Sequence, residues 1–379
     1  MTLLFLDSFD HYTTTDMNSK WDVGSGTSVN DPPSIALRQS RGIGREDSSN
    51  FWEYSYVSSF SAHAVIYFGT AFYYDRSDGV LQLQCLRSLS GQSAVELNYY
   101  TDHIQMYRGG DGTPSADVAY TLPRFTWAYI EFAVFTHLTA GWVVVRINGI
   151  EVLNVTGINT KAVLTVDTDI NGITMSGADV YFDDLYIANG AASQTFLGPI
   201  YVHAIAPRGG TAVQQSTLFG GGARIENAQG SIVAPGNRVR SISGKNLISS
   251  TQADLFVYHP LTLPSGGVRA VQVTVCGRRT SGGIDVYLYQ PLHGGILTTA
   301  SVGALTTSFI PRYVYFPFEN NPATSAPWTL VDVNALQAGY KGDNASGVEI
   351  THCLLEVAVS AAGGYVPDYM PAEPLYMIA

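Results

Sequence analysis

The segment over residues 141–156 constrains the fold more than any other part of the sequence. Two apolar, β-branched runs flank the dipeptide Asn148-Gly149. A two-residue type I′ turn needs positive φ at both central positions, which Asn and Gly tolerate best, and its twist matches that of antiparallel strands. The segment therefore predicts a β-hairpin.

Alternating segments of this kind recur along the chain, whereas the 3.6-residue period of an amphipathic helix is nearly absent. The run Trp127–Phe135 is long enough for a central strand, and Ile104 and Met106 alternate around Gln105. In the C-terminal half we expect strands over residues 254–259, 268–276, 284–290, 313–318 and 349–360. The pattern predicts an all-β fold class.

One helix is expected, over residues 329–338. Thr329 and Asp332 have the spacing of a capping box, and Gly339 stands where a helix-ending glycine belongs. A chain of 379 residues suits two domains, and the small, polar segment 188–195 is the best boundary. We predict two β-sandwich modules, residues 1–195 and 196–379, with the helix in the second.

Composition limits the partners of the protein. Only 13% of the residues are charged, which predicts a surface packed against neighbours, for example in a homo-oligomer such as a trimer. The formal net charge of −11 argues against nucleic acid as a partner. No apolar run is long enough for membrane insertion, and the N-terminus has no signal-peptide pattern, so we expect synthesis in a host cytoplasm. The three cysteines are far apart, which argues against a disulfide framework and a zinc site, and Cys85 and Cys353 lie in apolar alternation that predicts buried free thiols.

Residues 127–190 resemble the concanavalin A-like/laminin-G-like jelly roll in three pieces. These are the run that begins at Trp127, the hairpin around Asn148-Gly149, and residues 180–187. In that family the third piece is the last strand and returns beside the N-terminal one, for which residues 3–10 are suited. The resemblance covers roughly residues 1–190 and implies an N-terminal concanavalin A-like domain.

A narrower likeness concerns the junction after this domain. Residues 182–190, residues 196–202 and Pro207 are similar to a junction in tailed-bacteriophage virion proteins, and residues 327–339 are similar to another segment of such proteins. The resemblance implies a structural protein on the virion surface, in a tail fibre, a tail tip or a capsid decoration. Its partners would be other virion proteins, and its roles assembly and host attachment.

The carboxylates do not have the arrangement of a hydrolase. Glucan-cleaving jelly rolls carry acid and nucleophile at alternate positions of one strand, about 5 Å apart. Here Glu131 stands alone among aromatics, and Asp183 and Asp184 are adjacent. The first interpretation of this pair is that both side chains are solvated at a turn or strand end. The second is a calcium site at the rim of the sandwich, and the third is a catalytic pair. We expect no enzyme and no cofactor other than calcium, and a polysaccharide-degrading enzyme is the least favoured alternative.

A cluster of aromatic residues supports a second hypothesis about the function. Its members are suited to core packing, to a subunit interface, or to stacking on a host surface glycan. They include Trp52, Tyr54, Tyr56, Tyr73 and Tyr74. The alternative to a structural virion role is therefore a lectin-type, glycan-binding receptor module.

Overall fold

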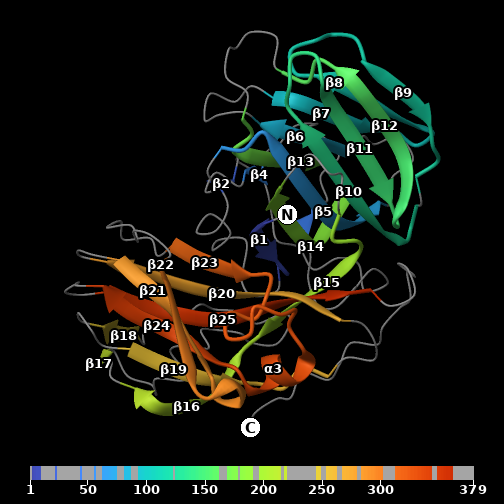
Figure 1. Ribbon diagram of the computed structural model, residues 1–379. Helices are drawn as coiled ribbons and strands as arrows, with labels where there is room; N and C mark the ends of the chain where they lie inside the picture. Colours follow the sequence, from blue (N-terminus) through green and yellow to red (C-terminus); the bar gives the residue numbers. More distant parts are fainter. Residues whose placement is uncertain are drawn as a thin grey trace. The chain divides into compact units, whose positions relative to one another are not determined.

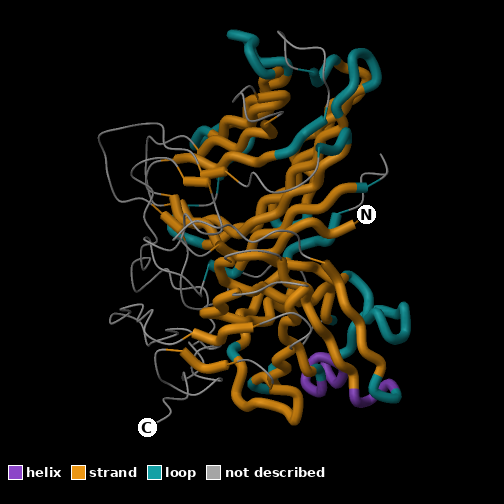
Figure 2. The backbone as a smooth tube through the Cα atoms, turned by 90° about the vertical axis from the view of Figure 1, so that its left-hand side faces the viewer, coloured by secondary structure: helices purple, strands orange, loops and turns teal. Residues whose placement is uncertain are grey.

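Strands dominate the computed structural model (Figures 1 and 2), and only a small part of the described residues is helical. The described residues fall in two compact units, unit 1 within residues 1–200 together with Ala361, and unit 2 within residues 201–360. The predicted boundary between residues 195 and 196 lies just before this division. Among these residues no helix is long and apolar enough to cross a membrane. The structure describes residues 2–9, 22–23, 43–44, 55–56, 62–74, 81–86, 93–122, 124–161, 169–177, 180–190, 196–214, 217–219, 245–248, 253–262, 267–279, 283–301, 312–343 and 348–361.

Unit 1 is a sandwich of two antiparallel sheets. In sheet A the order is β1 (Thr2–Asp7), β14 (Val180–Asn189), β5 (Val65–Tyr74), β10 (Trp127–Phe135), β11 (Gly141–Ile147) and β12 (Ile150–Ile158), with β3 (Ile43–Gly44) also beside β14. In sheet B it is β2 (Asp22–Val23), β4 (Ser55–Tyr56), β13 (Gly172–Gly177), β6 (Leu81–Leu86), β7 (Ser93–Tyr99), β8 (His103–Arg108) and β9 (Ala116–Ala119).

Two sequence predictions about unit 1 are confirmed. Strands β11 and β12 form the predicted hairpin, and its turn residues Asn148 and Gly149 have φ angles of 52° and 79°, as a type I′ turn requires. Strand β14 pairs antiparallel with β1, for example Phe5 with Ile187. The last strand of the unit thus returns beside the first, as the jelly-roll resemblance implied.

Unit 2 is a second antiparallel sandwich, so the predicted all-β fold class with two β-sandwich modules is confirmed. All five strands expected in the C-terminal half are present. Sheet C holds β17 (Thr217–Phe219), β18 (Lys245–Ile248), β25 (Val348–Ser360), β20 (Val268–Arg279) and β23 (Arg312–Phe318), with β15 (Ile200–Ile205) beside β25. Sheet D holds β16 (Pro207–Gln214), β19 (Ala253–Tyr258), β24 (Gln337–Asp343), β21 (Gly283–Gln290) and β22 (Ile296–Ser301).

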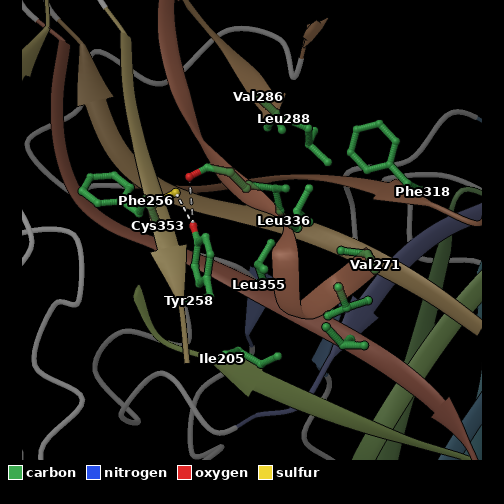
Figure 3. Close-up of a cluster of buried hydrophobic side chains, with 14 of the residues drawn as sticks. Ile205, Phe256, Tyr258, Val271, Val286, Leu288, Phe318, Leu336, Cys353 and Leu355 are labelled. Carbon is green, nitrogen blue, oxygen red and sulfur yellow. Dashed lines mark hydrogen bonds between the residues drawn. The ribbon is translucent and has the colours of Figure 1, made fainter. Parts of the chain in front are cut away.

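Alternate residues of β20, β21 and β25 fill the core of unit 2 (Figure 3), among them Val271, Val286 and Leu355. Cys353 is a buried free thiol, as predicted, and so is Cys276, whereas the side chain of Cys85 lies outside the described part. The Tyr258 hydroxyl lies 3.3 Å from the Cys353 Sγ, and burial raises the pKa of the thiol to about 12. Cys353 is therefore a packing residue and not a nucleophile.

The predicted helix is present but shorter than expected. Helix α3 covers Leu330–Ala335, after a short 3-10 helix η1 (Pro291–His293) earlier in the chain. The capping box between Thr329 and Asp332 is formed in both directions. Gly339 does not end the helix, because it lies in β24, where a Cβ would stand 1.8 Å from the Asp254 carbonyl oxygen. Pairing of β24 between β19 and β21 overrides the local helix pattern there.

Replacing the cap residue should destabilise unit 2 modestly. Thr329→Ala removes the hydroxyl that accepts from the Asp332 backbone N–H, and we expect a loss of about 1 kcal/mol, as for other N-caps. Thr329→Ser, which keeps the hydroxyl, is the matched control. Equal calorimetric transitions for wild type and Thr329→Ala would contradict the expected effect.

Candidate functional site

The polar side of sheet B is the candidate site. Along β7 and β8, Leu97, Ile104 and Met106 are buried in the sandwich, and the residues between them are partly exposed. Successive side chains of a strand point to opposite sides, so these residues line the other side of the sheet. We call this surface the β7–β9 face; its residues are Glu96, Asn98, Tyr100, His103, Gln105, Tyr107 and Asp117 (strands in Figure 1).

Side-chain hydrogen bonds join residues of β8 and β9 on this face. Gln105 on β8 is the central member: its Oε1 accepts from the Tyr107 hydroxyl at 2.5 Å, and its Nε2 donates to Asp117 Oδ2 on β9 at 2.9 Å. Gln105 and Asp117 are direct cross-strand partners. The chain of bonds fixes an amide, a phenol and a carboxylate side by side on one surface.

An aromatic stack stands at the end of the same face. The rings of Tyr100 and His103 lie 4.4 Å apart with an interplanar angle of 12°. The His103 Nδ1 is 2.6 Å from Asp102 Oδ1, in the turn between β7 and β8. The stack and this bond together hold the imidazole in one orientation, while the Asp102 side chain remains 80% exposed.

Two groups on the face have raised pKa values. Burial raises the pKa of Glu96, although a hydrogen bond with Ser93 opposes the shift. Burial also raises the pKa of Tyr107, with further contributions from Tyr100, Asp117 and Glu96. Tyr107 therefore carries its proton at neutral pH and acts as a donor.

The predicted aromatic residues have different places. Trp52 and Tyr54 lie outside the described residues, and only the backbones of Tyr56 and Tyr74 are described. Tyr56 on β4 pairs with Thr174, at the start of a register row that crosses sheet B to Glu96 and Tyr107. Tyr73 is buried, and its ring centroid lies 5.8 Å from that of Trp127 and 6.1 Å from that of Tyr181. Of the three roles considered for the aromatic cluster, Tyr73 therefore has that of core packing.

Asp183 and Asp184 do not lie at a strand end. They occupy the interior of β14 at a β-bulge and are only 2% and 1% exposed, so the interpretation as a solvated pair is wrong. Asp184 has a φ of 51°, and its N–H donates to Asp183 Oδ1 at 2.8 Å. Within the described ranges no group of three or more His, Cys, Asp or Glu side chains is placed to hold a metal ion. Calcium at this pair stays a prediction.

Glu131 has a role that its sequence context did not predict. A register row crosses four strands of sheet A, from Tyr186 through Gly69 and Glu131 to Arg146. Glu131 is fully buried, and its Oε1 accepts from the Tyr186 hydroxyl at 2.7 Å and from the Gly198 N–H at 2.9 Å. It thereby ties residues 196–200 to the sheet, a structural role rather than a ligand contact.

No protein-family model matches the sequence, and no curated protein matches it. Solved structures resemble about half of the chain. A protein of unknown function with a galectin-like fold from Bacillus subtilis has 11% identity, a TM-score of 0.37, and coverage of 50% of this chain and 96% of its own. The metal-free carbohydrate recognition domain of Emp46p has 9% identity, a TM-score of 0.35, and coverage of 50% of this chain and 100% of its own. Lectin II from Ulex europaeus has 10% identity, a TM-score of 0.33, and coverage of 48% of this chain and 97% of its own. Likeness this weak says nothing of a ligand for this chain.

Proposed function

We propose that unit 1 is a non-enzymatic, glycan-binding module and that the β7–β9 face is its binding site. One observation carries the proposal: on a partly exposed sheet face a phenol, an amide and a carboxylate are hydrogen-bonded together, and the same face carries an imidazole that is bonded to Asp102 and stacked on Tyr100. Sugars present hydroxyls that both donate and accept, together with apolar C–H surfaces. A face that combines amide and carboxylate groups with aromatic rings suits both features.

The array is also preorganised. Gln105 is held from both sides, by Tyr107 and by Asp117, and His103 is held by Asp102 and the Tyr100 ring. Side chains already fixed lose little conformational freedom when a ligand binds, so more of the contact energy remains as affinity. Such a site needs no loop closure.

The proposal is tested with Gln105→Ala. Wild type should bind one or more oligosaccharides on a glycan array. The variant should bind the best of them about 2- to 10-fold more weakly, since the loss of a hydrogen bond between neutral groups costs about 0.5–1.5 kcal/mol. Isothermal titration measures the change.

The matched control is Asn154→Ala on β12 of sheet A, where Asn154 donates to Glu151 at 3.0 Å on an exposed surface. It should bind as wild type does. Thermal unfolding of both variants separates a lost contact from a lost fold. Silence across the array, or wild-type affinity in Gln105→Ala, would refute the proposed site.

A place on a bacteriophage particle is the wider proposal. It is supported by the sequence similarity around residues 182–207 and by the low content of charged residues. There the module would attach to host glycans, with other virion proteins and further copies of the chain as its partners. Mass spectrometry of purified particles with immunogold labelling tests this; absence from intact particles would contradict it.

The absence of catalysis is likewise proposed. Asp183 and Asp184 are buried in β14, and Glu131 is buried in β10, so these carboxylates are not aligned along an open face. A bound oligosaccharide incubated with the protein should release no reducing ends. Release of reducing ends would identify a hydrolase instead.

A further inference from the structure

Carboxylates surround the β7–β9 face. Glu96 lies on β7 and Asp117 on the edge strand β9, and Asp102 lies in the turn that joins β7 to β8. Asp117 and Asp102 are exposed, and Glu96 is partly exposed. Glu96 and Asp117 thus lie on the same face as Gln105 and Tyr107, and Asp102 lies beside this face, bonded to His103.

Basic side chains do not balance these charges. Within the described strands of sheet B, Arg108 is the only lysine or arginine. It follows Tyr107 directly, so it points to the other side of the strand. Its Nε donates to the Lys161 carbonyl, and its guanidinium lies 3.8 Å from Asp111. The imidazole of His103 is the other basic group on the face, and it is bonded to Asp102.

We propose that this face selects glycans that carry no acidic group, whether neutral or amine-bearing, and discriminates against uronic, sialic and sulfated sugars. The inference rests on the proposed function and names the ligand class of that same site. Arginine and lysine are the side chains best suited to bind carboxylate or sulfate groups directly. On the described strands of sheet B an acidic sugar would meet like charges and no such partner, whereas the carboxylates favour neutral hydroxyls and ammonium groups.

The test is a glycan array that contains neutral, amine-bearing and acidic oligosaccharides, read at low and at high salt. We expect neutral or amine-bearing hits only. For a neutral hit, the uronic-acid counterpart should bind at least about tenfold more weakly at low salt, and its methyl ester should regain affinity. The difference in affinity between the neutral sugar and its uronic-acid counterpart should become smaller at high salt, because salt screens the exposed carboxylates.

Charge-neutralising variants connect the selectivity to this face. Asp117→Asn and Asp102→Asn should each narrow the gap between the neutral sugar and the uronic acid by about threefold or more. The control Glu151→Gln removes a carboxylate from exposed strand β12 of sheet A and should leave the gap unchanged.

The failures of the two proposals differ. No binding to any oligosaccharide overturns the proposed function and this inference with it. Binding to acidic sugars as tight as to neutral ones, or a gap that neither Asp variant alters, overturns the inference and leaves glycan binding standing.

Discussion

Gly69→Ala should destabilise unit 1 by about 3 kcal/mol, the upper end of the usual range for overpacking. Gly69 lies in the centre of β5, directly opposite Tyr186 of β14. A Cβ at this position would stand 2.1 Å from Cε1 of the Tyr186 ring. The ring cannot move aside, because it is fully buried and its hydroxyl is bonded to Glu131. Calorimetry should show the unit 1 transition lowered by roughly 2–4 °C for each kcal/mol lost.

Two further variants show whether the clash is the cause. Gly112→Ala adds the same methyl group where nothing lies within 4 Å, so its stability should stay within about 0.5 kcal/mol of wild type. In a Tyr186→Ala background the ring is gone, and Gly69→Ala should then cost much less. An unchanged cost in that background would show that Tyr186 is not what excludes the methyl group.

The sequence predicted local features well where local chemistry decides them. The Asn148-Gly149 turn, the capping box of Thr329 and Asp332, and the alternation of Ile104 and Met106 around Gln105 all follow from short-range rules. Gly339 was misread because its reason is long-range. It is glycine to admit the backbone of β19 and not to end a helix.

The candidate site shows the same division. Ile104 and Met106 were predicted to share one side of a strand, which already implied that Gln105 faces the other way. Its partner Asp117 could not be predicted, because residues 109–115, which connect β8 to β9, carry no turn signal that fixes the register of the pair. The role of Glu131 could not be predicted either, because its neighbours in the sequence are aromatic and its partner Gly198 lies 67 positions away.

Glu131→Ala should cost about 2–4 kcal/mol, because the Tyr186 hydroxyl would then lose its acceptor in a place that water does not reach. The Gly198 N–H, which is only partly buried, would also lose its acceptor. Glu131→Gln keeps an acceptor oxygen of the same shape and should cost far less at acidic pH. Glu151→Ala, on an exposed strand of the same sheet, is the control and should change stability by less than about 0.5 kcal/mol.

The comparison of wild type with Glu131→Gln should depend on pH. Burial raises the pKa of Glu131, although the hydrogen bonds from Tyr186 and Gly198 and the charge of Arg146 oppose the shift. Because the folded protein then holds the proton more tightly than the unfolded chain, the stabilisation is complete below the unfolded pKa of 4.5 and is lost as pH rises through the folded value. Glutamine cannot ionise, so the stability of Glu131→Gln should rise relative to wild type from mildly acidic to neutral pH. Subtracting the two unfolding curves cancels Glu96 and the other titrating groups, and a difference that stays constant with pH would show that Glu131 titrates in the folded protein as it does in the unfolded chain.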